Sequence, residues 1–188
     1  INIFRGIFEQ LSKYNDKNTI VIVITNPVDV LTTWVHRNTE FEESRIIGFG
    51  NMLDSLRYQY YSSNSNALVL GEHGDGMVLH ENESVDVANE VIYGAKQIIQ
   101  LLKNRSTMFA PSLCIANLVE AIATDAKKAL PVSVLTHGEY GQDKVSIGMP
   151  AIIGRKGIEE TKMPKLPEAE LEKVKLTAQK IADALAGK

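Results

Sequence analysis

The stretch Thr19-Ile20-Val21-Ile22-Val23-Ile24-Thr25-Asn26-Pro27 decides the fold. Five consecutive β-branched apolar residues stand between its two threonines, and no polar residue alternates with them. A continuous apolar run of this kind predicts a strand covered on both faces, which is typical of a parallel α/β sheet. Apolar positions then recur at helical spacing, at Val30, Leu31, Trp34 and Val35. The stretch therefore predicts a buried strand followed by a helix.

The junction between this strand and this helix is a candidate binding position. Pro27 suits the first turn of a helix, and Asn26 is a candidate for its cap. In open parallel sheets, ligands bind beyond the carboxyl ends of the strands, so Thr25 and Asn26 also stand where a ligand would contact the sheet. A capping residue can contact a ligand as well, so both interpretations of Asn26 stay open.

The chain begins at Ile1, without a methionine and already inside a helical pattern. The apolar positions of this pattern share one face: Ile3, Phe4, Ile7, Phe8 and Leu11. Because a chain rarely begins in the middle of an element, we expect the complete polypeptide to be longer, with a mass well above 20.8 kDa.

Composition excludes several classes of protein. The chain has 188 residues, of which 44% are hydrophobic, enough for one large domain or two small ones. A net charge of -3 provides no basic field for nucleic acid. No apolar run reaches the roughly 20 residues of a membrane span. The single cysteine, Cys114, lies in an apolar segment, which indicates a core residue in a reducing compartment, and we expect a cytoplasmic protein.

A short helix is predicted from Asn51 to Tyr58, after the apolar piece Arg45-Ile46-Ile47-Gly48. Asp54 and Arg57 are three residues apart, so both project from one face of this helix. One interpretation is an ordinary surface ion pair, worth a few tenths of a kcal/mol. The other is a carboxylate and a guanidinium that act together in a site.

The segment Gly71-Glu72-His73-Gly74-Asp75-Gly76 holds a histidine and two carboxylates among three glycines, which makes it the main candidate for a catalytic segment. It follows the apolar run Ala67-Leu68-Val69-Leu70, so a strand is expected to place His73 in a tight, glycine-rich turn. Histidine titrates near neutral pH and is the usual general acid or base. A solvated turn histidine is the alternative.

The remaining sequence predicts alternating helices and strands. Helices are expected over 84–105, 112–128 and 168–188, strands over 131–136 and 145–154, a hairpin loop over 138–141 and a further strand near 158–160. The last helix is expected to pack on its own domain, because its apolar stripe is too short for a coiled coil. Pro111 suits the first turn of the helix after the junction at Ser106-Thr107-Met108.

Three motifs follow one another along the chain: Asn26-Pro27-Val28-Asp29, Leu53-Asp54-Ser55-Leu56-Arg57 and Gly71-Glu72-His73-Gly74-Asp75. Together they resemble the NAD-dependent lactate and malate dehydrogenase family over almost the whole chain. The resemblance implies an α/β fold, in which the remainder of a Rossmann parallel sheet is followed by an α+β substrate domain with mostly antiparallel strands. It places the end of the NAD-binding domain at residues 1–48 and the substrate domain at 49–188.

The resemblance also implies roles for the motif residues. His73 would be the proton donor and acceptor, and Asp54 would orient and stabilise its imidazolium. Arg57 would bind the substrate carboxylate through two parallel hydrogen bonds. Asn26 would contact both the substrate and the nicotinamide ribose.

Other implied contacts are to the cofactor NAD and to the substrate pocket. Ile24 and Thr25 would line the cofactor groove beside Asn26. Thr107 would border the substrate pocket, although a plain hydroxyl at a helix start explains it equally well. No metal is implied. The Gly-rich phosphate turn and the mobile loop that carries the family's other substrate arginines are absent from the 188 residues. Two internal joins, near Tyr60–Asn64 and Val78–Asn82, are also shorter than is usual in the family.

The substrate is expected to be a small 2-oxo or 2-hydroxy acid. The hairpin Gly138-Glu139-Tyr140-Gly141 and the junction Thr107-Met108-Phe109-Ala110-Pro111 resemble the lactate-dehydrogenase-like malate dehydrogenases, which favours malate over lactate. The family implies a homotetramer or a dimer and a place in the tricarboxylic acid cycle, while the charge and the apolar pattern of the sequence predict no nucleic-acid or membrane partner. A non-catalytic binding protein is the alternative from another class. A metal hydrolase lacks a His-Glu-x-x-His pair here, and a serine hydrolase lacks a Gly-x-Ser-x-Gly elbow.

Overall fold

The structure is a computed structural model, and it describes residues 2–14, 16, 18–82, 84–103 and 105–186. Helices and strands follow one another along the chain as α1 (Asn2–Leu11), η1 (Ser12–Tyr14), β1 (Val21–Val23), α2 (Val28–Asn38), η2 (Glu43–Arg45), β2 (Ile46–Gly48), α3 (Asn51–Ser62), β3 (Val69–Gly71), β4 (Met77–Leu79), α4 (Val85–Leu102), α5 (Phe109–Ala123), β5 (Lys128–His137), η3 (Glu139–Gly141), β6 (Asp143–Gly154), β7 (Gly157–Thr161) and α6 (Glu168–Ala186).

One mixed sheet joins all the described strands. Its order is β1-β2-β5-β6-β3-β4, and β7 pairs with β6. β1 and β2 are parallel, whereas every other pairing is antiparallel. The predicted fold class, a parallel remnant followed by mostly antiparallel strands, is confirmed.

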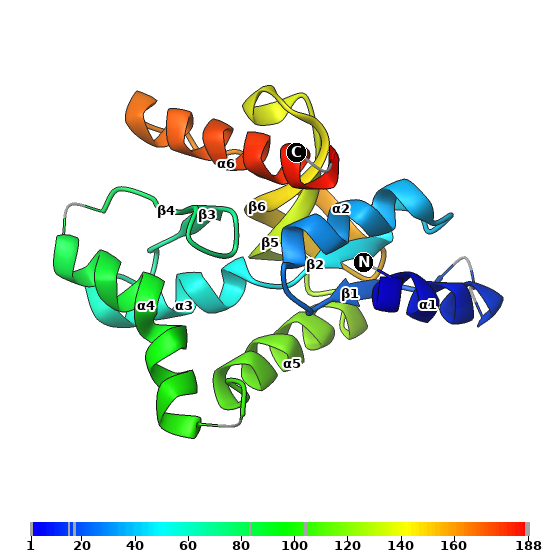
Figure 1. Cartoon of the computed structure of the whole chain (residues 1–188), viewed down its shortest axis with the longest axis horizontal. Coiled ribbons are helices and arrows are strands. Elements are labelled where there is room, and N and C mark those ends of the chain that lie inside the picture. The colour runs from blue at the N-terminus through cyan, green and yellow to red at the C-terminus, as the bar shows by residue number, and fades with distance from the viewer. Residues whose placement is uncertain (1, 15, 17, 83, 104, 187–188) are drawn as a thin grey trace.

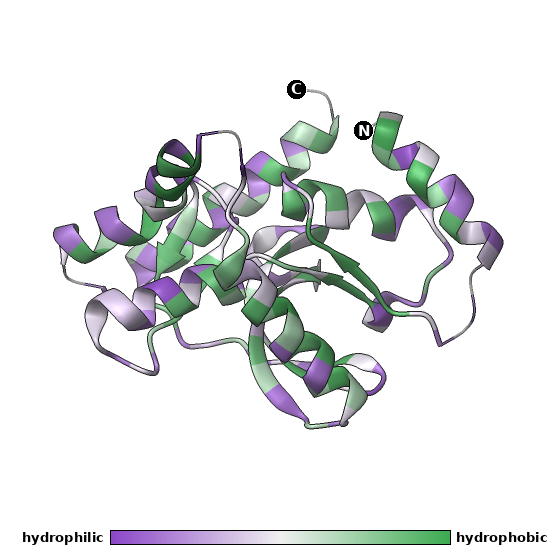
Figure 2. Cartoon of the chain, turned by 90° about the horizontal axis from the view of Figure 1, so that it is seen from below, coloured by the Kyte–Doolittle hydropathy of each residue, from purple (hydrophilic) through white to green (hydrophobic). Residues whose placement is uncertain are grey.

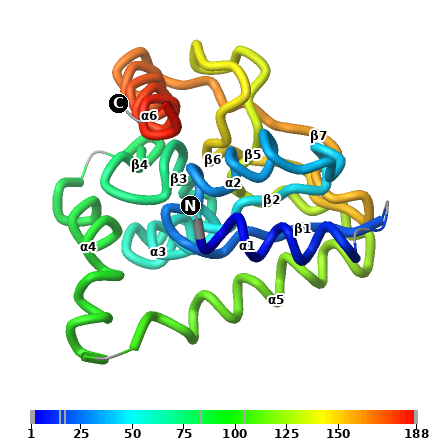
Figure 3. Tube along the Cα trace, turned by 45° about the vertical axis from the view of Figure 1, so that its right-hand side comes forward, coloured from blue at the N-terminus to red at the C-terminus, as the bar shows by residue number. Residues whose placement is uncertain are grey.

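Helices cover both sides of this sheet. Figures 1 and 3 show α6 on one side of the central strands and α5 on the other, with α1 alongside β1. Figure 2 shows that the central strands are the most apolar part of the chain, while the helices alternate polar and apolar turns. This pattern follows from the hydrophobic effect, because strands between two helical layers are removed from water on both faces.

Two apolar clusters account for most of the core. The larger cluster joins the antiparallel strands to α3, α5 and α6, with Ile147, Met149, Leu118 and Ile181 almost fully buried. A second cluster joins α1, β1, β2 and α2 around Trp34, which Phe8 approaches at 5.9 Å between ring centroids. The division of the chain into residues 1–48 and 49–188 stays a prediction, since the sheet runs through both parts.

The first strand differs from its prediction. β1 contains only three residues, and the Ile24 side chain is 56% exposed. β1 ends the order of the sheet, and among the described residues its one partner strand is β2. The apolar run therefore forms an edge strand rather than a central one, although Ile22 packs on the larger cluster and Val23 is buried in the second, so each face is at least partly covered. Likewise, Ile3, Ile7 and Leu11 of α1 are exposed, and only Phe4 and Phe8 pack on Trp34.

The prediction that Asn26 caps the following helix is wrong. α2 begins at Val28, its N-cap is Pro27, and no side chain makes the cap hydrogen bond. Asn26 therefore lies one residue too early to cap, and its amide is left exposed at the end of the strand. The peptide bond between Asn26 and Pro27 is cis.

Several other helices and strands begin or end at residues different from those predicted, and two strands, β2 and β4, were not predicted. The helix expected at 112–128 is α5, Phe109–Ala123, which ends where Asp125 and Lys127 adopt left-handed backbone angles. β2 and β4 have only three residues each, too short for a visible period. The expected hairpin and the strand near 158–160 are confirmed by η3 and β7. The last helix is confirmed through Ala186, and the final two positions of its prediction lie outside the described residues.

Candidate active site

His73 lies in the glycine-rich loop between β3 and β4, as the sequence predicts. Its side chain is 18% exposed. The imidazole rests on Gly50, at the N-terminus of α3, where an added Cβ would lie only 2.6 Å from Cγ of His73. Only glycine at position 50 therefore lets the ring approach the start of α3 this closely.

Asp54 is the partner of this imidazole. His73 Nδ1 donates a hydrogen bond to Oδ2 of Asp54, whose side chain is completely buried. This contact joins α3 to the loop over 19 positions of sequence. With Nδ1 committed to the carboxylate, the second ring nitrogen, Nε2, is the atom that can exchange a proton with a ligand.

Arg57 completes a cluster of three charged side chains. Its Nη1 donates to Oδ1 of Asp54 at 3.0 Å, and the Arg57 side chain is 13% exposed. Because Asp54 is fully buried, this is no ordinary surface ion pair. The structure thus brings together His73, Asp54 and Arg57, the three residues that the sequence predicts for proton transfer and for binding a carboxylate.

The charges in this cluster determine the protonation of His73. Burial alone would lower the pKa of the imidazole, but the hydrogen bond and the negative charge of Asp54 outweigh burial and raise the pKa of His73 above its ordinary 6.5. Asp29 raises it further, and Arg57 opposes the change. The site therefore stabilises the imidazolium of His73, which is the form that can donate a proton.

Sequence reasoning missed one residue of this cluster. Asp29 of α2 is 2% exposed, and its Oδ2 accepts a hydrogen bond from the backbone N–H of His73 at 2.8 Å. Its Oδ1 accepts a hydrogen bond from the Ser133 hydroxyl on β5. An acid three residues after Asn26 resembles an ordinary helix-start carboxylate, which hides this role in the sequence. The burial of an acid between Val28 and Val30 was the available signal.

The other three histidines differ from His73. His36 is largely buried in α2, and burial lowers its pKa to about 4, so it is neutral at physiological pH. His80 pairs with Glu170 of α6 at 2.8 Å. His137 contacts Glu43 on an exposed part of the surface. None of these has a second acid and a guanidinium linked to its partner, among the described residues.

The predicted cofactor residues line a groove between α1 and β1. Ile24, Thr25 and Asn26 are exposed beyond the end of β1, and they border a cavity of about 420 Å³ together with the exposed apolar side chains of α1. This is the carboxyl end of a parallel strand, where α/β sheets bind ligands. No hydrogen bond in the described part of the chain joins Asn26 to His73, Asp54 or Arg57.

Thr107 is not brought to the charged cluster. It lies, partly buried, in the connection between α4 and α5, and no described hydrogen bond joins it to His73 or Arg57. Arg57 instead borders an apolar groove of about 680 Å³ between α3, α4 and the start of α5, with Gly94, Ile98 and Ala110 among its lining residues.

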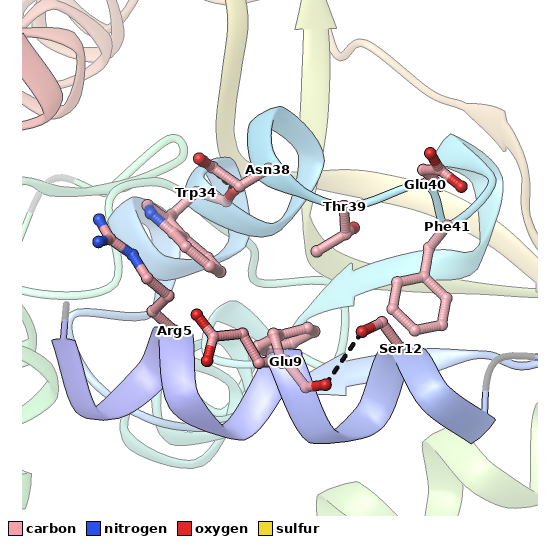
Figure 4. Close-up of a pocket in the computed structure, with 9 residues that line it drawn as sticks. Arg5, Glu9, Ser12, Trp34, Asn38, Thr39, Glu40 and Phe41 are labelled. Atoms are coloured by element: carbon pink, nitrogen blue, oxygen red, sulfur yellow. Dashed lines mark hydrogen bonds between the residues drawn. The ribbon is translucent and has the colours of Figure 1, made fainter.

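A further cavity, of about 360 Å³, lies between α1 and α2. Figure 4 shows Arg5 and Glu9 on α1, and Ser12 at the start of η1, facing Trp34 and the residues around the end of α2. Ser12 donates to the Glu9 backbone carbonyl there. No member of the His73 cluster lines this cavity. Across the described ranges, no three His, Cys, Asp or Glu side chains lie together as metal ligands. No helix in these ranges is long and apolar enough to cross a membrane.

Comparisons with known proteins agree with this geometry. Residues 1–48 match the model of the lactate/malate dehydrogenase NAD binding domain, and residues 55–187 match that of the lactate/malate dehydrogenase alpha/beta C-terminal domain. The chain belongs to the lactate/malate dehydrogenase family. The first match ends with β2 and the second begins inside α3, so Asp29 lies in the first, His73 and Arg57 lie in the second, and Asp54 lies just before the second.

Individual members of the lactate/malate dehydrogenase family are about one third identical to this chain. The malate dehydrogenase of Flavobacterium johnsoniae is 34% identical over 98% of the chain and 66% of its own length. The L-lactate dehydrogenase of Clostridium botulinum is 34% identical over 98% of the chain and 67% of its own length. The chain thus spans roughly three fifths to two thirds of the curated relatives it matches, the lowest share being 58%.

Solved structures of the family superpose closely. The malate dehydrogenase of Aeropyrum pernix matches 99% of the chain and 70% of its own chain, with a TM-score of 0.90 and 30% identity. The malate dehydrogenase of Archaeoglobus fulgidus, in complex with NADH, matches 97% of the chain and 67% of its own, with a TM-score of 0.85 and 30% identity.

Proposed function

We propose that this chain is the catalytic part of an NAD-dependent malate dehydrogenase, which reversibly transfers hydride between malate and oxaloacetate. The observation that carries the proposal is the joined cluster of Asp54, His73 and Arg57. It combines a group that can exchange a proton near neutral pH with a guanidinium that can bind a carboxylate. The reduction of a 2-oxo acid requires both the proton donor and the group that binds the carboxylate.

The residues of the chain divide the chemistry as follows. When bound, NADH supplies the hydride that reaches the substrate carbonyl carbon. His73 Nε2 gives a proton to the carbonyl oxygen during reduction and takes one back during oxidation. Asp54 stabilises the imidazolium and fixes the tautomer in which Nδ1 carries hydrogen. The guanidinium of Arg57 holds the substrate carboxylate and so orients the carbonyl group.

The remaining site residues take supporting roles in the proposal. Ile24, Thr25 and Asn26 lie in the 420 Å³ groove at the end of β1, which is consistent with contact to the nicotinamide end of NAD. The match to the family's NAD binding domain and the NADH bound by the Archaeoglobus fulgidus relative support the choice of cofactor. Thr107 stays a second-rank substrate contact. The domain boundary near residue 48 and a tetrameric or dimeric assembly also stay proposals.

Malate is favoured over lactate for two reasons. The hairpin at Gly138–Gly141 and the junction at Thr107–Pro111 resemble lactate-dehydrogenase-like malate dehydrogenases. In addition, relatives from Chlorobium and Flavobacterium are named malate dehydrogenases. L-lactate dehydrogenase is the second candidate, because relatives from Thermoanaerobacterium and Clostridium carry that name at similar identity.

The test is the oxidation of NADH by the complete gene product, followed with oxaloacetate and with pyruvate in the same preparation. The proposal expects NADH oxidation with oxaloacetate. If pyruvate is also reduced, kcat/KM should be higher for oxaloacetate than for pyruvate. A higher kcat/KM for pyruvate would assign the lactate activity instead. Turnover of neither substrate would overturn the dehydrogenase assignment and favour a non-catalytic binding protein.

A further inference from the structure

Asp29 connects three elements around the loop that carries His73. It lies in the first turn of α2, it is almost fully buried, and its two carboxylate oxygens have different partners. One oxygen accepts the backbone N–H of His73 at 2.8 Å, and the other accepts the hydroxyl of Ser133 on β5. The bond to His73 spans 44 positions of sequence, and the bond to Ser133 spans 104.

We propose that Asp29 is a positioning residue for His73, which ties the backbone of the β3–β4 loop to α2 so that the imidazole stays aligned between Asp54 and the substrate. This inference rests on the proposed dehydrogenase function for its catalytic consequence, although its geometric part does not. Ser133 is the second member of the device, because its hydroxyl orients the carboxylate of Asp29 toward the loop.

The loop needs such an external tie. Two of its five residues are glycines, and Gly71, the last residue of β3, has a φ of +81°, so the loop backbone has little conformational preference of its own. The side-chain bond from His73 to Asp54 leaves the backbone free to move. Asp29 holds the backbone at the same residue, so His73 is fixed from α3 through its ring and from α2 through its N–H. Both bonds are to carboxylates, which makes them stronger than bonds between neutral groups.

Space around this contact is arranged for close approach. An added Cβ at Gly48 would lie 2.6 Å from Cβ of Ser133, so glycine at the end of β2 lets Ser133 stand beneath α2. Gly50 does the same for the imidazole of His73. Two glycines thus flank the path from Ser133 through Asp29 to His73.

Burying this carboxylate has a cost that a merely structural residue would avoid. Burial raises the pKa of Asp29 and the bonds from Ser133 and His73 lower it, and the net result is a rise from 3.8 to about 6. The ionisable groups that act on Asp29 are His73 and Glu72, both in the loop, while β5 presents only the neutral Ser133. Conversely, His73 is influenced by Asp54 and Arg57 of α3 and by Asp29 of α2.

The helix that carries Asp29 also begins directly after Asn26 and Pro27. The proposed cofactor contacts at the end of β1 and the tie to His73 therefore belong to one short segment, residues 24–29. A displacement of the N-terminus of α2 would move both together. Asp29 thereby keeps the proton-transfer group in register with the cofactor side of the site.

Four variants of the complete gene product test the proposal: Asp29→Ala, Asp29→Asn, Ser133→Ala and Thr33→Val. Asp29→Ala removes the acceptor of the His73 N–H and should lower kcat about 100-fold, as expected for a misplaced catalytic group, while the Kd for NADH changes less than about 3-fold. Ser133→Ala should lower kcat about 3- to 10-fold, because Asp29 keeps its bond to His73. Thr33→Val is the matched control, since it loses the buried bond from the Ser146 N–H of β6 and the bond to the backbone carbonyl of Asp29, but leaves both contacts of the Asp29 carboxylate in place.

Asp29→Asn separates positioning from a general loss of stability. The amide oxygen can still accept the His73 N–H, so kcat should stay within about 3-fold, while loss of the negative charge lowers the pKa of His73. The pH profile of kcat/KM measures this change, and NMR titration of the ¹³C-labelled His73 imidazole measures it without any turnover.

The outcomes distinguish this inference from the proposed function. A lower His73 pKa in Asp29→Asn, in a protein that turns over neither acid, would support the tie to His73 and overturn the dehydrogenase. An active protein in which Asp29→Ala behaves like Thr33→Val would overturn the positioning role alone. An unchanged His73 titration in Asp29→Asn would also overturn it.

Discussion

Three histidine–carboxylate pairs lie in the described part of the chain; two of them are largely buried, and only one of these two is built as a site. His73 and His80 both use Nδ1, both have side chains that are 18% exposed, and both contact a carboxylate on a helix. The carboxylate of the first pair, Asp54, is completely buried and also bound by Arg57. The carboxylate of the second, Glu170, is 15% exposed, and its other oxygen accepts the neighbouring backbone N–H of Glu81.

The difference shows what turns a histidine pair into a proton-transfer group. His80 and Glu170 join the end of β4 to the first turn of α6, so their contact closes the fold. The backbone carbonyl of His80 also accepts the Tyr58 hydroxyl at 3.0 Å. His73 has instead a second carboxylate, Asp29, at its backbone and a guanidinium beside its partner. A charge network from three elements, and not the pair itself, is the feature that indicates chemistry.

The largest effect is expected when the carboxylate of the catalytic pair is neutralised. Asp54→Asn removes the charge that stabilises the imidazolium and permits the wrong tautomer of His73, so kcat with oxaloacetate should fall about 10²- to 10⁴-fold. Stopped-flow or steady-state NADH oxidation measures the loss, and circular dichroism verifies the fold. Retention of more than a tenth of the activity by Asp54→Asn would contradict the proton-transfer role that sets the His73–Asp54 pair apart from the His80–Glu170 pair.

Arg57→Lys should have the next largest effect. A lysine keeps the charge but cannot offer the two parallel hydrogen bonds of a guanidinium, so kcat/KM for the oxo acid should fall about 10- to 100-fold. The matched control is Arg45→Lys. Arg45 also pairs with an acid three residues away, Glu42, but none of its described hydrogen bonds or ion pairs reaches the loop that carries His73. Equal losses in both variants would remove Arg57 from the substrate site.

The buried Asp29 predicts a pH dependence of stability. Its folded pKa, about 6, lies above the 3.8 of the unfolded chain, so its stabilising contribution is present below 3.8 and is lost as the pH rises through 6. The difference in the free energy of unfolding between wild type and Asp29→Asn should therefore shift by about 2 kcal/mol against wild type between pH 4.5 and pH 7. Urea unfolding at both pH values measures it, with Glu40→Gln, on the exposed surface, as control. A difference that is constant with pH would contradict the burial of an ionised carboxylate.

The smallest effect is expected for the pair His80–Glu170, which connects β4 to α6. Glu170→Gln weakens the contacts to His80 and to the Glu81 N–H, so the free energy of unfolding should fall by about 1 kcal/mol while kcat is unchanged. Thermal unfolding should show a Tm lower by about 2–4 °C. Glu172→Gln, which only loses an exposed pair with Lys175, should change stability by less than about 0.5 kcal/mol. A fall in kcat for Glu170→Gln would assign the second pair to the site as well.

Much of the fold and of the cluster could be predicted from the sequence because the signals were local. Alternating strands, helix periods and glycine-rich turns predict β5, β6, the hairpin and α6 within a few residues. Asp54 and Arg57 share a helix face through their spacing alone. The meeting of Asp54 with His73 was available only through resemblance to a family, because no local pattern indicates a contact over 19 residues.

Features that depend on long-range contacts could not be predicted. Asp29 meets Ser133 and His73 through contacts over 104 and 44 positions, and its sequence context is that of any helix start. The exposure of Ile24 and Ile7 depends on which strand or helix lies beside β1, and apolar periodicity does not report that. β2 and β4 are three-residue strands that exist only because longer neighbours pair with them.

The most direct test of the account compares His73→Asn with His80→Asn in one assay of NADH oxidation by oxaloacetate, using the complete gene product. The account predicts that His73→Asn lowers kcat by about 10²- to 10⁴-fold with the Kd for NADH unchanged, while His80→Asn stays within about 3-fold of wild type. Near-normal turnover by His73→Asn, or equal losses in the two variants, would contradict it.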